Sequence, residues 1–195
     1  AKARVLLELA ERRLGDLDRV RTLDVGCGLG LVHRHLGPLA GRLEGVDVSS
    51  GLVEEAARRN PAVRYRTFDG DRLPYEDGAF ELTFAICVLH HVEPAARRDF
   101  VHELIRATRP GGLVAVFEHN PLNPLTRLVV RRCAFDEGVV LVGRRTLERL
   151  LADPATTDVR SRYLLFTPWK ATWALERPLG GVPLGAQYVS YGSRV

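Results

Sequence analysis

The chain has 195 residues and contains no methionine, two lysines and three cysteines. The cysteines Cys27, Cys87 and Cys133 are widely spaced and form no CxxC pair, which argues against a disulfide framework and a thiolate zinc site. Six histidines are present, but none stands at metal-ligand spacing with a supporting carboxylate in a helix, so we expect no metal site. Because no initial methionine is present, we expect that the chain begins after processing or inside a longer chain, and the sequence leaves open whether an N-terminal piece is missing.

Long hydrophobic runs are also lacking. No apolar run approaches the ~20 residues that a transmembrane helix requires. Residues 1–17 are charged and amphipathic and lack the apolar core of a signal peptide, so we expect a cytoplasmic protein. The net charge of +4 comes almost entirely from arginine, and no basic run with interleaved aromatics is present. We therefore expect a small-molecule partner and no nucleic acid.

Helical and strand patterns alternate along the chain, which predicts βαβ units and a mostly parallel sheet. We expect a single domain over residues 1–195, with a core at 18–118, an elaborated stretch at about 119–145 and C-terminal strands at about 158–193. The expected strands are 20–25, 43–48, 63–68, 80–88, 113–117, 159–166 and 187–192. The expected helices include 29–36, 52–59, one that begins at Pro94, 126–134 and 146–152.

The most specific motif runs from Leu23 to Gly30 and reads LDVGCGLG. It follows a predicted strand and precedes a predicted helix, and its glycines Gly26, Gly28 and Gly30 allow a tight turn and close approach of a ligand. The spacing is GxGxG, whereas dinucleotide-binding turns have GxGxxG. Asp24 would repel a pyrophosphate at this place but suits an ammonium group.

Two further carboxylates follow the next two predicted strands. Asp47 could accept hydrogen bonds from both hydroxyls of a ribose, although it could equally cap a helix. Asp69 could accept from an adenine amino group, although Asp69-Gly70-Asp71 is also favourable turn chemistry. All three acidic positions fall at the carboxyl ends of adjacent strands, where α/β sheets bind ligands. This coincidence favours a cofactor site.

These residues resemble the class I, Rossmann-like, S-adenosylmethionine-dependent methyltransferases, and most of all the small-molecule branch that includes quinone-biosynthesis enzymes. The resemblance covers about Val20 to Glu118. It rests on the glycine-rich motif, on Asp47 and Asp69, and on the segments Leu73-Pro74-Tyr75, Phe80-Glu81-Leu82, Val88-Leu89-His90-His91 and Arg109-Pro110-Gly111-Gly112. One departure is Glu81, where the family usually has aspartate.

The resemblance implies a doubly wound, seven-stranded, mostly parallel sheet with an antiparallel last strand and helices on both faces. It implies S-adenosyl-L-methionine as the cofactor and S-adenosyl-L-homocysteine as the product. The methionine part would contact Asp24, Gly26, Cys27, Gly28 and Gly30. The ribose would contact Asp47, the adenine would contact Val48, Asp69 and Gly70, and Ile86 and Cys87 would line the cofactor.

Methyl transfer needs a general base only when the acceptor is an unactivated hydroxyl or a carbon acid. The candidates are His90 and His91 after the fourth strand, Glu118 and His119 at the end of the fifth and, with less support, Asp136. Taken singly, each of His90 and His91 could instead cap a helix or pack. The dense polar residues after Phe117 favour contact with the substrate, although Asn120 before Pro121 could simply form an Asx turn.

Two residue groups leave the acceptor open. The arginines could attract an anionic acceptor or cover a solvated helix face; they are Arg127, Arg131, Arg132, Arg144 and Arg145. The aromatics could wall a pocket for a ring or pack in the core; they are Tyr163, Phe166, Trp169 and Trp173.

Three other functions predict different features. A nicotinamide-dependent oxidoreductase predicts GxGxxG and no Asp24. A nucleic-acid methyltransferase predicts an Asn-Pro-Pro-aromatic type of motif where Cys87-Val88-Leu89-His90 stands. A non-catalytic module that binds S-adenosylmethionine would keep the same glycines and acids, and only turnover distinguishes it from an enzyme.

Overall fold

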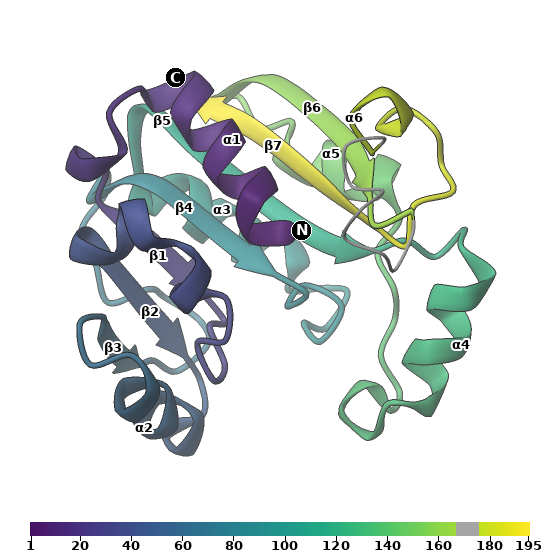
Figure 1. Cartoon of the computed structure of the whole chain (residues 1–195), viewed down its shortest axis with the longest axis horizontal. Coiled ribbons are helices and arrows are strands. Elements are labelled where there is room, and N and C mark those ends of the chain that lie inside the picture. The colour runs from purple at the N-terminus through teal and green to yellow at the C-terminus, as the bar shows by residue number, and fades with distance from the viewer. Residues whose placement is uncertain (167–175) are drawn as a thin grey trace.

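The computed structural model describes residues 1–166 and 176–195. Within these residues, seven strands form one sheet in the order β3-β2-β1-β4-β5-β7-β6 (Figure 1). The strands are β1 Thr22–Val25, β2 Leu43–Asp47, β3 Arg64–Thr67, β4 Phe80–Ile86, β5 Thr108–His119, β6 Thr156–Leu164 and β7 Gln187–Arg194.

The α-helices are α1 Lys2–Leu14, α2 Ser50–Arg59, α3 Arg97–Ala107, α4 Pro124–Arg132, α5 Arg144–Leu151 and α6 Glu176–Leu179. Short 3-10 helices are η1 Leu17–Arg19, η2 His33–His35, η3 Gly37–Arg42 and η4 Ala134–Asp136. No helix in the described ranges is both long and apolar enough to cross a membrane.

The direction of the strands follows the expectation from the sequence. Strands β1 to β5 pair in parallel, whereas β7 pairs antiparallel with both β5 and β6. The expected seven-stranded, mostly parallel sheet with an antiparallel last strand is therefore confirmed. Both C-terminal strands lie near their expected places.

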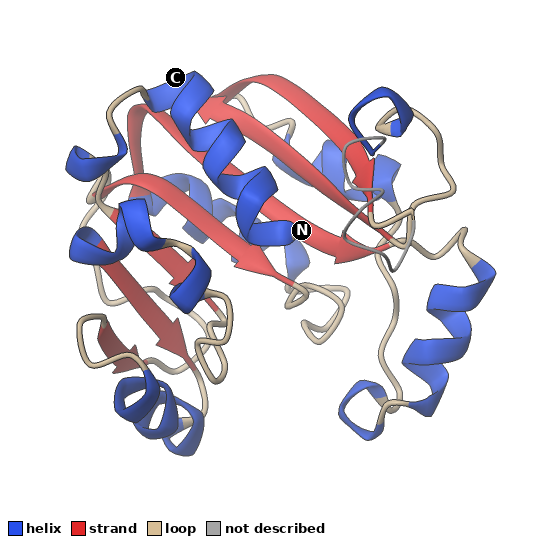
Figure 2. Ribbon diagram, in the orientation of Figure 1, coloured by secondary structure: helices blue, strands red, loops and turns tan. Residues whose placement is uncertain are grey.

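Helices lie on both faces of the sheet, as a doubly wound fold requires (Figure 2), and a hydrophobic core lies on each face. Along β5, alternate side chains point to opposite faces. Leu113, Ala115 and Phe117 join the core under α1, while Val114 and Val116 join the core that contains α3 and α5. Phe117 is fully buried, which contributes roughly 1.5–3 kcal/mol to folding relative to an exposed side chain.

One helix prediction is wrong, and the predicted start of a second helix is misplaced. The segment 29–36 forms turns and the short η2, because Gly30 and Gly37-Pro38 leave only six residues between them, fewer than two helical turns. The helix predicted to begin at Pro94 is α3, which begins at Arg97 after a stretch of turns.

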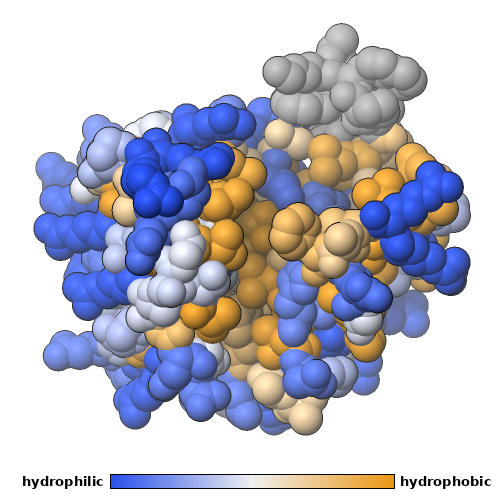
Figure 3. Space-filling model, turned by 90° about the horizontal axis from the view of Figure 1, so that it is seen from below, coloured by the Kyte–Doolittle hydropathy of each residue, from blue (hydrophilic) through white to orange (hydrophobic). Residues whose placement is uncertain are grey.

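The carboxyl ends of β1, β2, β4 and β5 lie at one edge of the sheet, because parallel neighbours point the same way. In Figure 1 the arrowheads of β1, β2 and β4 point toward the lower side of the molecule. Figure 3 looks onto that side and shows hydrophobic residues gathered along a hollow in the middle of the face. The residues that the sequence singles out follow these strand ends.

Candidate functional site

The glycine-rich loop lies at the end of β1 and is tied to β2. The backbone N–H groups of Gly26 and Cys27 both donate to the carbonyl of Val46, at 2.8 and 3.0 Å. Gly28 has a φ of +50°, and a Cβ built on it would meet nothing within 4 Å. The loop therefore leaves an open space beside Gly28, where a ligand can approach the backbone.

No α-helix begins at this loop, so the helix expected after the motif does not present free N–H groups to a ligand there. Instead, Gly30 is packed tightly. A Cβ on Gly30 would lie 2.5 Å from the hydroxyl oxygen of Tyr65. The third glycine of the motif is therefore required by packing, whereas Gly28 faces open space.

Asp47 at the end of β2 holds the glycine-rich loop. Its Oδ2 accepts from the N–H of Gly28 at 2.8 Å, and its Oδ1 accepts from the N–H of Ser49 at 3.0 Å. Ser49, not Asp47, caps α2, because the Ser49 side chain accepts from the N–H of Leu52. A carboxylate has about four acceptor positions, so Asp47 keeps capacity for two further donors.

Asp24 on β1 is 2% exposed and bonds to a histidine that the sequence did not point to. Its Oδ2 lies 2.8 Å from Nε2 of His33, and Nδ1 of His33 lies 2.6 Å from the hydroxyl oxygen of Tyr65. Burial raises the pKa of Asp24, while its hydrogen bond to His33 acts in the opposite direction. The other oxygen, Oδ1, is buried without a partner among the described residues, which suits a donor brought by a ligand.

The residues expected around an adenine lie together at the same edge. A Cβ on Gly70 would lie 3.4 Å from Cγ1 of Val48, whose side chain is 61% exposed. Asp69 is exposed, and its Oδ1 accepts from the N–H groups of Asp71 and Arg72 at 3.0 and 3.3 Å. Asp69 therefore makes the expected turn and retains Oδ2 as an acceptor.

Ile86 ends β4 and Cys87 follows it with a left-handed φ of 58°. Its sulfur accepts hydrogen bonds from Nζ of Lys2 at 3.6 Å and from Nε2 of Gln187 at 3.3 Å. Burial raises the pKa of the Cys87 thiol to about 11, and burial also raises the pKa of the Cys27 thiol. Both cysteines are therefore protonated near neutral pH and suit packing rather than nucleophilic attack.

Five polar residues converge beside this edge: His90, His91, Glu118, His119 and Asp136. Oε2 of Glu118 lies 2.7 Å from Nδ1 of His90, and these side chains are 0% and 1% exposed. The ring of His90 lies 4.2 Å from that of His91 and 5.1 Å from that of His119, between centroids. Oδ1 of Asp136, on η4, lies 3.5 Å from Nε2 of His90 and 3.4 Å from Nε2 of His91.

Burial and the neighbouring charges shift the pKa values of the three histidines in different directions. Burial alone would lower the pKa of His90, but its hydrogen bond to Glu118 and the charges of Glu118 and Asp136 outweigh burial, so the pKa is raised. Burial and the charge of His90 lower the pKa values of His91 and His119. Neither His90 nor His91 caps α3, whose N-cap is Ala96, so the alternative of a capping pair is wrong.

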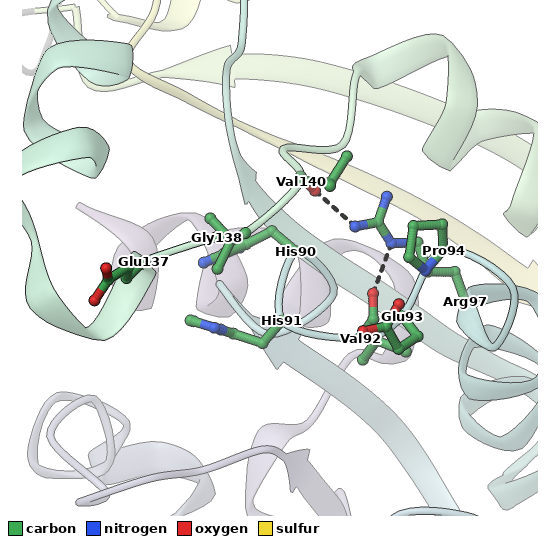
Figure 4. A pocket seen from close by; sticks show the side chains of 10 residues that line it. His90, His91, Val92, Glu93, Pro94, Arg97, Glu137, Gly138 and Val140 are labelled. Carbon is green, nitrogen blue, oxygen red and sulfur yellow. Dashed lines mark hydrogen bonds between the residues drawn. The ribbon is translucent and has the colours of Figure 1, made fainter.

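A cavity of about 250 Å³ adjoins the cluster and is lined in part by His90, His91, Arg97 and Glu137. In Figure 4 both histidines project from one loop toward the segment that carries Glu137 and Gly138. Arg97 joins the two walls, since its Nε donates to the carbonyl of Val92 at 3.0 Å and its Nη2 donates to that of Val140 at 2.6 Å.

Several other residues have structural roles. The side chain of Asn120 accepts from the N–H of Leu122 and donates to the carbonyls of Pro183 and Gly185, so the expected Asx turn is confirmed. Tyr163 is 5% exposed and belongs to the core, and Phe166 packs against that core. Trp169 and Trp173 lie outside the described residues.

The five arginines that the sequence analysis singled out do not line this cavity. Arg127, Arg131 and Arg132 are exposed on α4, and Arg145 is exposed on α5. Arg144 pairs with Glu148 and lies over the ring of Tyr163.

Comparison with known proteins bears on this arrangement. Residues 23–116 match the family described as methyltransferase domain. These residues make up a methyltransferase domain. They contain the glycine-rich loop, both buried acids and the two histidines after β4.

The chain is also similar in sequence to curated methyltransferases. A demethylmenaquinone methyltransferase from Beutenbergia cavernae is 34% identical over 117 residues, which are 59% of this chain and 48% of that protein. A malonyl-[acyl-carrier protein] O-methyltransferase from Enterobacter lignolyticus is 29% identical over 175 residues, which are 88% of this chain and 67% of that protein. The chain thus spans about half the length of the first relative and about two thirds of the second.

A solved structure agrees on the fold. A SAM-dependent methyltransferase from Archaeoglobus fulgidus superposes with a TM-score of 0.71 at 14% identity, covering 98% of this chain and 94% of that one. At this identity the likeness concerns the fold alone. It extends over β6 and β7, which lie beyond the matched methyltransferase domain.

Proposed function

We propose that the chain is an S-adenosylmethionine-dependent methyltransferase that acts on a small-molecule acceptor and works in the cytoplasm. The observation that carries this is a hydrogen bond between the glycine-rich loop and a buried acid. Asp47 accepts from the N–H of Gly28 and can still accept from two further donors. The free Oδ1 of Asp24 supplies a second acceptor at the same edge. Acceptor atoms of this kind fit a ligand with ribose hydroxyls and an ammonium group.

The roles of the cofactor residues follow from their positions. Asp47 would hold the ribose, Asp24 the ammonium group, and the Gly26–Gly30 loop the methionine part. Val48 and Gly70 would lie against the adenine, with Asp69 at its edge. Bound S-adenosylmethionine supplies a methyl group on a positively charged sulfur, and the sulfur leaves as a neutral thioether when the acceptor atom takes the methyl.

The acceptor would be a hydroxyl compound that loses a proton on methylation. A proton acceptor is needed only for such a hydroxyl or for a carbon acid, and the chain concentrates three imidazoles and two carboxylates beside the cavity. His90, His91, Glu118 and His119 would hold the acceptor oxygen and take part in removing its proton. The similarity to a malonyl-[acyl-carrier protein] O-methyltransferase supports the same assignment.

The test is formation of S-adenosylhomocysteine by the purified chain with a panel of small phenols, alcohols, carboxylic acids and amines. We expect turnover with a hydroxyl compound, and a fall of about 100-fold or more in His90→Ala, since a positioned acid–base group contributes about 10²–10⁴-fold. Cofactor binding without S-adenosylhomocysteine from any acceptor would indicate a non-catalytic binding module. Turnover with amines alone would overturn the hydroxyl assignment.

A further inference from the structure

The side chains of His90, His91 and Asp136 place three electron-pair donors around one point. Oδ1 of Asp136 lies 3.5 Å from Nε2 of His90 and 3.4 Å from Nε2 of His91, and the three atoms all lie within 4.8 Å of one another. Hydrogen bonds between nitrogen and oxygen are shorter, at about 2.7–3.2 Å. Separations of about 3.4 Å are those between neighbouring ligands in a tetrahedron with metal–ligand bonds of about 2.1 Å.

Glu118 makes the donor set more specific. Its Oε2 lies 2.7 Å from Nδ1 of His90 and can accept a hydrogen bond from Nδ1–H, which in the neutral ring leaves the Nε2 lone pair for the shared point. A histidine that binds a metal through one nitrogen commonly donates from the other to a carboxylate, which orients the ring. The second oxygen, Oε1, is fully buried and has no partner in the described part of the chain.

We propose that His90, His91 and Asp136 bind one divalent transition-metal cation, with Glu118 as the carboxylate behind His90. Two imidazoles and one carboxylate suit zinc, cobalt or iron(II), whereas magnesium and calcium take oxygen ligands. Both histidines line the cavity, so the cation keeps an open coordination position toward it. The role in catalysis, which rests on the proposed function, is to bind the acceptor oxygen.

The cation acts as a Lewis acid on that oxygen. Coordination lowers the pKa of the acceptor hydroxyl, as it does for metal-bound water. With a cation bound, His90 and His91 act on the proton through the cation and not as bases, so the hydroxyl proton passes to bulk water. The metal-bound oxygen then has the electron pair that forms the new bond to the methyl carbon, while the carbon–sulfur pair stays on sulfur. No electron is gained or lost by the cation.

The binding test uses the chelator-treated full chain, titrated with Zn²⁺ by calorimetry and with Co²⁺ by its visible absorption. We expect one cation per chain. His91→Ala and Asp136→Asn should lose stoichiometric binding, and Glu118→Gln should weaken it about 10- to 100-fold, as for other carboxylates behind metal-binding histidines. The side chain of His91 is 41% exposed, so its removal leaves the core intact.

Matched controls come from α3, where Asp99 and His102 are both exposed and lie three residues apart. Asp99→Asn and His102→Ala should bind Zn²⁺ as the parent chain does. Absence of one-to-one binding in the parent chain would overturn the inference. So would binding that His91→Ala and Asp136→Asn leave unchanged.

Activity separates this inference from the proposed function. Methylation that persists in chelator-treated protein would overturn the catalytic role of the cation and leave the methyltransferase assignment in place. One-to-one Zn²⁺ binding that the two variants abolish, with no methylation of any acceptor, would support the metal site and contradict the proposed function.

Discussion

Glu118, at the end of β5, orients His90, in the loop after β4, through a contact of 2.7 Å between Oε2 and Nδ1. Neither side chain is more than 1% exposed. Because Glu118 accepts a hydrogen bond from Nδ1–H, Nε2 of the neutral His90 ring faces Asp136 and the cavity with its lone pair. This relationship links the sheet edge to the polar cluster where the acceptor would lie.

Replacing Glu118 with glutamine should lower kcat and leave cofactor binding unchanged. The glutamine amide can donate to Nδ1 and so reverse the tautomer of His90, turning Nε2 into a donor. We expect kcat to fall about 10- to 100-fold, the range seen when a carboxylate behind a functional histidine is changed. Steady-state rates of S-adenosylhomocysteine formation give this comparison.

Glu103→Gln is the control for that change. Glu103 is a half-buried carboxylate on α3 that bonds to Arg106 and to the N–H of Leu73, away from the cluster. Glu103→Gln should lower thermal stability and keep kcat. An unchanged kcat in Glu118→Gln would contradict the role given to Glu118.

The open space at Gly28 predicts that alanine there weakens cofactor binding, whereas alanine at Gly111 does not. Gly28 and Gly111 have φ values of +50° and +75°, and a Cβ on either one meets nothing within 4 Å. Alanine at either position should cost a similar free energy of folding, about 1–2 kcal/mol for a left-handed residue. Only Gly28→Ala should weaken S-adenosylmethionine binding, by tenfold or more, in a calorimetric titration. Equal affinities in the two variants would show that the cofactor does not approach Gly28.

Asp24 predicts a pH dependence of stability in the cofactor-free protein. Burial raises its folded pKa above the unfolded value of 3.8, against the effect of His33 and with a further contribution from Asp47. The folded state therefore binds the proton more tightly, and this contribution to stability is present below pH 3.8 and is lost as pH rises through the folded pKa. Relative to Asp24→Asn, the free energy of unfolding of the parent chain should fall as pH rises from about 4.

Denaturant unfolding of both proteins between pH 4 and 7 measures this difference. The two proteins differ only at residue 24, so the difference between their profiles reports on the Asp24 carboxyl and its contacts. Parallel stability profiles would mean that the carboxyl of Asp24 is not destabilised by burial.

The sequence predicts the frame of the fold because the frame depends on local patterns. Apolar runs such as Phe80–Ile86 identify buried strands, and their alternation with helices predicts the parallel order that the structure has. The position of Asp47 at the end of β2 follows from the local strand pattern and does not depend on its hydrogen-bond partners. The failed helix at 29–36 shows the limit, since Gly30 and Gly37-Pro38 interrupt an otherwise helical apolar pattern.

The contacts that complete the site are not local. Asp136 reaches His90 and His91 from a segment with no periodic pattern, so sequence spacing does not reveal the three-residue group. No sequence pattern around His33 predicts its contact with Asp24. Gln187 contacts Cys87 because β7 lies beside β5 in the sheet. Such contacts depend on tertiary packing that no single segment encodes.

The central claim is tested most directly by calorimetric titration of the chain and of Asp47→Ala with S-adenosylmethionine, S-adenosylhomocysteine and NADH. The account predicts that the parent chain binds the first two and not NADH. It predicts at least about 100-fold weaker binding in a folded Asp47→Ala, because two charge-assisted hydrogen bonds of about 1.5 kcal/mol or more each are lost. Binding of NADH alone, or affinities for S-adenosylmethionine that Asp47→Ala leaves unchanged, would contradict it.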